Sequence, residues 1–161
     1  MSNAERKNVL HGPIYQCLRN ITIFSELTRE ELLFMADQMH LLRTAPGNAI
    51  FKEDTPGDFV CFVVDGRLQV LKAFQGAKKS IAELTAGQSI GEMAVVGNFP
   101  RSATVISLTD ATLLTLKRDR LNEICVDHPR IGVKVFKAIA QLLSHHLRRT
   151  SENLFELMPP G

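Results

Sequence analysis

Cysteine is scarce in this sequence of 161 residues, which contains only Cys17, Cys61 and Cys125 and no Cys-x-x-Cys pair. Such an odd, widely spaced set is not typical of a disulfide framework, offers no iron–sulfur ligand cluster, and fits a reducing compartment such as the cytoplasm. The sequence also lacks the run of roughly 18 apolar residues that a transmembrane helix needs, and a secretory pattern at its start. We therefore expect neither a membrane span nor export.

Excess charge of one sign is also missing. Lys and Arg total 19 against 17 Asp and Glu, which gives a net charge of +2 at pH 7. This balance does not predict nucleic acid or an anionic membrane as the partner. The length and a hydrophobic fraction of 45% are ordinary for one globular domain with a single core.

Histidine is absent from residues 48–117, the segment with strand-like patterning. The five histidines lie outside it: His11, His40, His128, His145 and His146. A metal-dependent enzyme on a β-barrel needs several histidines and a carboxylate that converge inside the barrel. Adjacent residues on a helix point about 100° apart, which is a poor geometry for one metal ion. We therefore predict no catalytic residue, no metal site and no enzyme activity, and we interpret Cys61 as a buried structural thiol.

Two periodicities divide the chain. Thr28 and Glu31 have the spacing of a capping box and predict a helix that ends near His40. Short apolar segments with strand character then follow at 49–51, 59–64, 68–71, 81–84, 103–106 and 111–116. Turn signals separate them: Pro56-Gly57, Asp65-Gly66, Gln75-Gly76 and Ala86-Gly87. This pattern predicts an antiparallel β-roll of the jelly-roll or cupin-like type and excludes a parallel α/β sheet, with Asp65-Gly66 as the clearest hairpin.

Helical spacing returns after Lys117, first at 121–126 and then, after Pro129, to about Leu157. Apolar and small residues repeat every three or four positions along this long helix: Phe136, Ala140, Leu143, Leu147, Thr150, Leu154 and Leu157. The stripe favours a self-associating coiled coil and hence a homodimer. The alternative is that its first half packs on the roll.

The segment 87–105 departs from the strand pattern. Gly91 permits a tight turn, and residues 92–96 could form one helical turn whose free N–H groups face an anion. Arg101 offers a permanent charge and paired donors to a phosphate, and Ser102 offers a hydroxyl. Glu92, when ionised, can only accept hydrogen bonds, so a sugar hydroxyl suits it. The alternative is a surface ion pair between Glu92 and Arg101. If the segment binds a ligand, Arg101→Ala is expected to abolish binding and leave the fold intact, because a surface or pocket arginine contributes little to a core.

Gly91-Glu92-Met93-Ala94 followed by Pro100-Arg101-Ser102-Ala103-Thr104 closely resembles the phosphate-binding cassette of cyclic nucleotide-binding domains. The resemblance also takes in Gly47, Gly57, the Asp65-Gly66 turn and Gly87, and it runs from about residue 21 to about residue 150. It implies an eight-stranded β-roll between helices, with cAMP or cGMP as the ligand. Arg101 would bind the cyclic phosphate and Glu92 the ribose 2′-hydroxyl. The same resemblance implies a pocket lined by Gly91, Met93, Ala94, Ser102 and Ala103.

We predict three segments: an N-terminal extension over 1–20, the helix and β-roll over 21–128, and a long helix for dimerisation over 129–161. The function predicted is a cyclic nucleotide sensor without cofactor or catalysis, acting through movement of its C-terminal helices. Too few residues follow Leu157 for a winged helix-turn-helix, so we expect no direct DNA binding. The alternatives are the sensor part of a catabolite activator-type regulator, or a degenerate domain that serves as a dimeric interaction module.

Overall fold

The computed structural model describes residues 12–156. Residues 12–19 are helical, and a 3₁₀ turn η1 (Thr22–Phe24) and helix α2 (Arg29–Gln38) follow. The predicted capping box is confirmed, because Thr28 Oγ1 accepts from the Glu31 N–H and Glu31 Oε2 accepts from the Thr28 N–H. Among the described residues, no helix is both long and apolar enough to cross a membrane.

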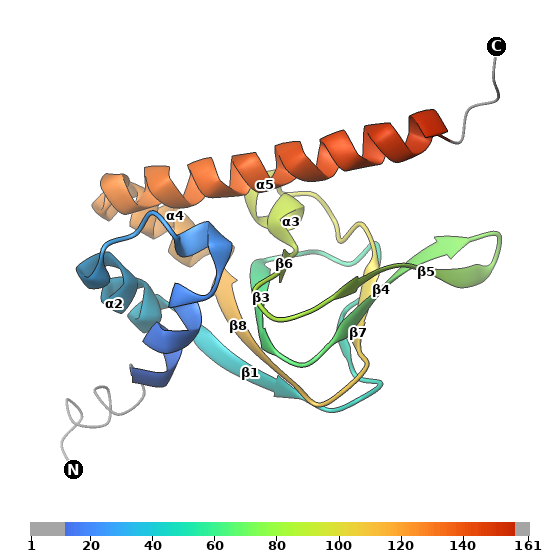
Figure 1. The fold of residues 1–161 in the computed structure, drawn as a ribbon, viewed down its shortest axis with the longest axis horizontal. Coiled ribbons are helices and arrows are strands. Elements are labelled where there is room, and N and C mark those ends of the chain that lie inside the picture. The colour runs from blue at the N-terminus through green and yellow to red at the C-terminus, as the bar shows by residue number, and fades with distance from the viewer. Residues whose placement is uncertain (1–11, 157–161) are drawn as a thin grey trace.

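Eight antiparallel strands form two four-stranded sheets, which confirms the predicted β-roll (Figure 1). One sheet has the order β1-β8-β3-β6 and the other β2-β7-β4-β5. The strands of the first sheet are β1 (His40–Thr44), β3 (Phe59–Asp65), β6 (Ser89–Ile90) and β8 (Ala111–Lys117). Those of the second are β2 (Ala49–Phe51), β4 (Leu68–Phe74), β5 (Ala77–Leu84) and β7 (Thr104–Ser107).

The prediction that Asp65-Gly66 makes a hairpin is wrong. It joins β3 to β4, but these strands lie in different sheets. The turn crosses from one sheet to the other because both strands must place their apolar faces on the shared interior. Gly66 has a φ of +90°, and a Cβ there would lie 2.5 Å from the Asp110 carbonyl oxygen. The local hairpin is the β4–β5 pair, whose turn residues Gln75 and Gly76 both have positive φ.

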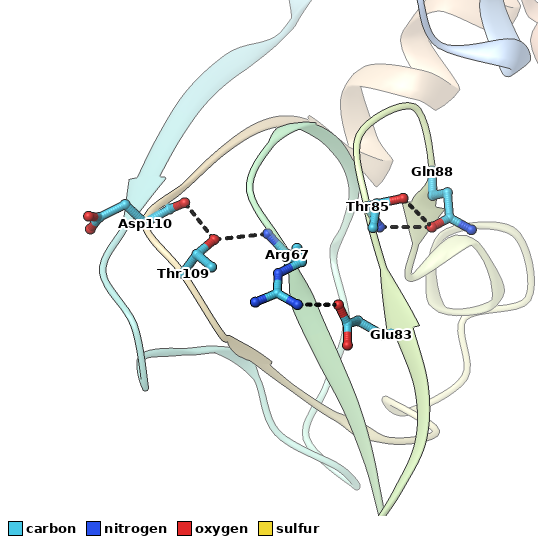
Figure 2. Close-up of polar contacts among 6 residues, drawn as sticks. All are labelled: Arg67, Glu83, Thr85, Gln88, Thr109 and Asp110. Atoms are coloured by element: carbon cyan, nitrogen blue, oxygen red, sulfur yellow. Dashed lines mark hydrogen bonds and ion pairs between the residues drawn. The ribbon is translucent and has the colours of Figure 1, made fainter.

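Two strands escaped the sequence pattern. β1 pairs with β8, yet its first four residues are exposed, so no apolar alternation marks it. β6 has two residues and pairs with β3. The turn before β6 is closed by the Gln88 side chain, whose Oε1 accepts from the Thr85 N–H at 2.8 Å (Figure 2). β6 follows this turn, and Gly91 comes immediately after β6.

Two buried clusters make up the core. The larger lies between the helices and the first sheet and includes Leu18, Phe24, Phe62 and Leu116. The smaller lies inside the roll around Val63 and other aliphatic side chains. Leu18 belongs to the N-terminal segment 1–20 and is completely buried, so its side chain is part of the main core.

The C-terminal region consists of α4 (Arg118–Asp127) and α5 (Pro129–Glu156), which passes over α4 and the short helix α3 (Glu92–Val96) and extends beyond the roll (Figure 1). The buried residues of α5 are Ile131, Gly132, Val135 and Ile139. Two ion pairs join the same half to the helical region before the roll, from Lys134 to Glu31 in α2 at 2.6 Å and from Lys137 to Glu26, which precedes α2, at 3.2 Å. The N-terminal half of α5 is therefore fixed to the body of the domain.

The predicted apolar stripe of α5 does not face a single surface. Leu147 and Leu154 are 68% and 64% exposed, whereas Leu143 and Thr150 line a pocket described below. Leu157 lies outside the described residues. The stripe thus divides between a cavity wall and a solvent-facing ridge.

Candidate functional site

The segment that interrupts the β-pattern forms α3, and the predicted helical turn over Glu92–Val96 is confirmed. Gly91 precedes it with a φ of +96°, a conformation that glycine adopts without steric cost. A Cβ on Gly91 would also lie 2.4 Å from Arg101 Nη1. Glycine is therefore required twice here, by the turn and by the neighbouring guanidinium.

Glu92 and Arg101 are buried, with exposed fractions of 4% and 2%. Glu92 Oε1 and all three guanidinium nitrogens of Arg101 have no hydrogen-bond partner among the described residues. The interpretation as a surface ion pair is therefore wrong: the residues are not at the surface, and no hydrogen bond joins them. Buried polar groups are normally hydrogen-bonded, so these four atoms need an explanation.

Aromatic rings and backbone contacts hold Arg101 in place. Its Cζ lies 4.0 Å from the ring centroid of Phe51 and 4.5 Å from that of Phe59. The Arg101 N–H donates to the Thr55 carbonyl, and the Arg101 carbonyl accepts from the Asp54 N–H, both at 2.9 Å. Cation–π contacts stabilise the charge partly but leave the N–H groups unpaired.

The electrostatics of the site follow from its burial. Loss of solvent lowers the pKa of the Arg101 guanidinium, although an arginine keeps its charge at neutral pH. Burial also raises the pKa of the Cys61 thiol to about 12, so Cys61 is neutral and lies completely inside the roll. The predicted role of Cys61 as a buried thiol is confirmed. Arg101 is therefore a buried, permanently charged group with no hydrogen-bonded counter-ion among the described side chains.

The Glu92 and Arg101 side chains line a pocket of about 710 Å³, a size typical of small-molecule sites. All seven residues singled out in the sequence line it: Gly91, Glu92, Met93, Ala94, Arg101, Ser102 and Ala103. Within residues 12–156, no group of three or more His, Cys, Asp or Glu side chains could hold a metal ion.

The sequence does not identify which residues form the far wall of the pocket. Five residues from α5 contribute to it: Leu143, His146, Arg149, Thr150 and Asn153. They share one face of the helix because they are spaced by three or four positions, but nothing in the sequence says which surface that face covers. Lys72 and Glu83 on the β4–β5 hairpin also line the pocket. Lys72 Nζ donates to the Ser102 carbonyl at 2.7 Å and so ties the hairpin to the segment carrying Arg101.

Comparison with known proteins identifies the class that this fold and pocket represent. Residues 41–128, more than half of the chain, match the model of the cyclic nucleotide-binding domain. The chain therefore belongs to the cyclic nucleotide-binding domain family.

The chain is also similar to individual proteins of known function. The chain is 22% identical over 144 residues to a CRP-like cAMP-activated global transcriptional regulator of Mycobacterium tuberculosis, covering 89% of this chain and 62% of that protein. It is 31% identical over 119 residues to the cGMP-dependent protein kinase egl-4 of Caenorhabditis briggsae, covering 74% of this chain and 15% of the kinase. The chain thus spans less than two thirds of either relative.

Solved structures agree with this assignment. A cyclic nucleotide-binding domain from Methylobacillus flagellatus KT superposes with a TM-score of 0.82 at 24% identity, covering 94% of this chain and 85% of that one. The Catabolite Activator Protein of Thermus thermophilus gives a TM-score of 0.76 at 25% identity, covering 84% and 62%. The β-roll and its flanking helices are therefore those of the family.

Proposed function

We propose that this chain binds cAMP or cGMP in the pocket and acts as a sensor. The observation that carries the proposal is the buried Arg101 guanidinium, whose three nitrogens have no partner among the described residues. A cyclic phosphate has two free anionic oxygens, which suit the paired donors of a guanidinium. Its arrival would give Arg101 both a counter-ion and hydrogen-bond acceptors.

The remaining cassette residues fit the rest of such a ligand. Glu92 Oε1 is a buried acceptor without a partner, so it suits the ribose 2′-hydroxyl as donor. Ser102 is exposed at the pocket and adds a hydroxyl. Gly91, Met93, Ala94 and Ala103 form the adjacent wall. Small and apolar residues there leave room for the sugar and phosphate.

Signalling would use the helices. The C-terminal half of α5 lines the pocket, so a ligand that contacts it can favour one arrangement of α4 and α5 over another. The exposed ridge containing Leu147 and Leu154 suits a second copy of the chain, and we propose a homodimer through α5. No catalysis by the chain and no cofactor are involved in this proposal, and the cytoplasm is the proposed location.

Isothermal titration calorimetry with cAMP and with cGMP tests the binding function, and a thermal shift assay provides a second readout. A ligand at 100 times its Kd should stabilise the folded state by about 2.7 kcal/mol. Arg101→Met should raise the Kd by a factor of about 10²–10⁴ and so remove most of the thermal shift at the same ligand concentration. Arg120→Met is the matched control, because Arg120 pairs with Glu123 on the surface. Lack of binding of either nucleotide by the wild-type protein would refute the proposal.

A further inference from the structure

A second arginine, Arg118, contacts the site from outside the pocket. It is the first residue of α4. Its Nη2 donates to the Gly57 carbonyl at 2.7 Å, and its backbone N–H donates to the Asp58 carbonyl at 2.7 Å. Its Nη1 donates to Asn98 Oδ1. One residue of α4 thus binds two segments that are 40 residues apart in the sequence.

The first segment is the wall behind Arg101. A Cβ on Gly57 would lie 2.8 Å from Arg101 Nε and 2.4 Å from the Ala94 Cβ. The Gly57 backbone is thus packed against the guanidinium and against α3, with no room for a side chain. Arg118 holds this backbone through its carbonyl oxygen, so the position of Arg118 sets how closely the wall approaches Arg101.

The second segment is the exit from α3. Asn98 follows Gly97, which ends the helix, and it has a φ of +53°. Because α3 has only five residues, a restraint on Asn98 is also a restraint on Glu92 at the other end. Arg118 therefore restrains both the guanidinium wall and the helix that carries the carboxylate.

Stability of α4 does not explain an arginine at this position. The N-terminus of a helix carries a partial positive charge, which disfavours a cation in the first turn. Lys117, just before Arg118, provides no side-chain cap either. What the Arg118 side chain does gain is the pair of contacts to Gly57 and Asn98.

We propose that Arg118 is a positioning residue for nucleotide binding, which clamps the wall behind Arg101 and the exit of α3 onto the first turn of α4. The inference rests on the proposed function. It adds a physical connection between the pocket and α4 that does not require the ligand to contact α4. By linkage, a nucleotide that tightens the clamp is bound more strongly when the clamp is present.

Calorimetry of four variants with cAMP and cGMP tests the clamp. Arg118→Ala should raise the Kd about tenfold, within the range seen for coupling residues that do not touch a ligand. Asn98→Gly, which removes the amide but tolerates the positive φ, should raise it about threefold. The double variant should resemble Arg118→Ala alone, because both changes break the same contact. Arg120→Ala, the neighbouring arginine that pairs with Glu123, should bind like the wild type.

Amide hydrogen exchange distinguishes the loss of this connection from a general loss of stability. In the wild type, nucleotide should slow amide exchange both at 92–98 and at 118–121. In Arg118→Ala at saturating nucleotide, residues 92–98 should still be protected while 118–121 should no longer respond. Binding by Arg118→Ala within twofold of the wild type, or effects of the two single changes that multiply, would overturn the clamp. Failure of the wild type itself to bind would instead refute the proposed function, and the clamp with it.

Discussion

Replacement of Arg101 by methionine should separate ligand binding from folding. The wild-type guanidinium is buried, and its three nitrogens have no hydrogen-bond partner among the described residues. An unsatisfied buried polar group costs about 1–3 kcal/mol. The contacts with Phe51 and Phe59 offset part of this cost, at about 0.5–2 kcal/mol each. The net contribution of the charged group to the ligand-free protein should therefore be close to zero or unfavourable.

Methionine keeps the apolar length of the side chain between the two rings and adds sulfur–aromatic contacts of about 0.3–1.5 kcal/mol. We expect the free energy of unfolding of Arg101→Met, measured by urea denaturation without ligand, to equal that of the wild type or exceed it by up to about 2 kcal/mol. Alanine would instead leave a gap against Phe51 and Phe59 and lower stability by about 1–3 kcal/mol. The sequence alone predicts an intact fold for Arg101→Ala, because a surface or pocket arginine contributes little to a core. The contacts with Phe51 and Phe59 predict this loss of stability instead.

In Arg101→Met, nucleotide affinity should fall although the stability of the ligand-free protein is kept. Two charge-assisted hydrogen bonds to a phosphate contribute about 1.5–3 kcal/mol each, so their loss should raise the Kd by a factor of about 10²–10⁴. Calorimetry on the same preparation measures this. A loss of more than about 2 kcal/mol of unfolding free energy in Arg101→Met would show that the guanidinium stabilises the fold and would refute the reasoning. So would a Kd within about tenfold of the wild type.

Three further outcomes test other parts of the molecule. Glu92→Gln should raise the Kd for cAMP by about 10–150-fold and that for 2′-deoxy-cAMP far less; equal losses would exclude the ribose contact. Leu147→Glu should convert a dimer to a monomer in sedimentation velocity, because it places a charge on the exposed ridge of α5; an unchanged dimer would exclude that ridge. Hydrogen bonds from Lys134 and from the Thr28 backbone lower the pKa of Glu31 from its ordinary value near 4.5. Glu31 should thus stabilise the fold above that pH, and this stabilisation should be lost as the pH falls through its folded pKa. Urea denaturation at several pH values should show this dependence in the wild type and not in Glu31→Gln. Identical pH profiles of the unfolding free energy in the two proteins would refute it.

The parts of the fold that follow local rules could be predicted from the sequence. The capping box at Thr28 and the turn of helix over Glu92–Val96 appear as expected, because hydrogen bonds between near neighbours fix both. Strands with buried faces, such as β3 and β8, also show their apolar runs directly. The residues around Arg101 that line the pocket were also predicted, from the hydrogen-bonding properties of Glu92, Arg101 and Ser102 and from the resemblance to the phosphate-binding cassette.

Features that depend on distant partners could not be predicted. β1 is an exposed edge strand recognised only by its pairing with β8. Asp65-Gly66 connects two different sheets, and a Cβ on Gly66 would clash with the carbonyl oxygen of Asp110, which is distant in the sequence. The sequence predicts Arg101 as a phosphate ligand, but it does not show that Arg101 is buried against Phe51 of β2 and Phe59 of β3. In each case the deciding neighbour is far away in the sequence.

The position of α5 limits how a nucleotide could switch this domain. Contacts that are the same in both helix arrangements add affinity but shift no equilibrium. The Arg101 backbone is hydrogen-bonded to Thr55 and Asp54 and not to α4 or α5, so a phosphate contact with Arg101 would add affinity in either arrangement. The α5 side chains at the pocket include His146, Arg149 and Thr150, and a hydrogen bond to one of them would contribute about 0.5–1.5 kcal/mol, or about 1.5–3 kcal/mol where the group is charged. A complete switch from 1:99 to 99:1 requires about 5.5 kcal/mol. In the proposed mechanism, any part of this free energy that α5 does not supply would come from contacts elsewhere, and the contact of Arg118 with Asn98 and Gly57 joins α4 to the pocket wall and to the exit of α3.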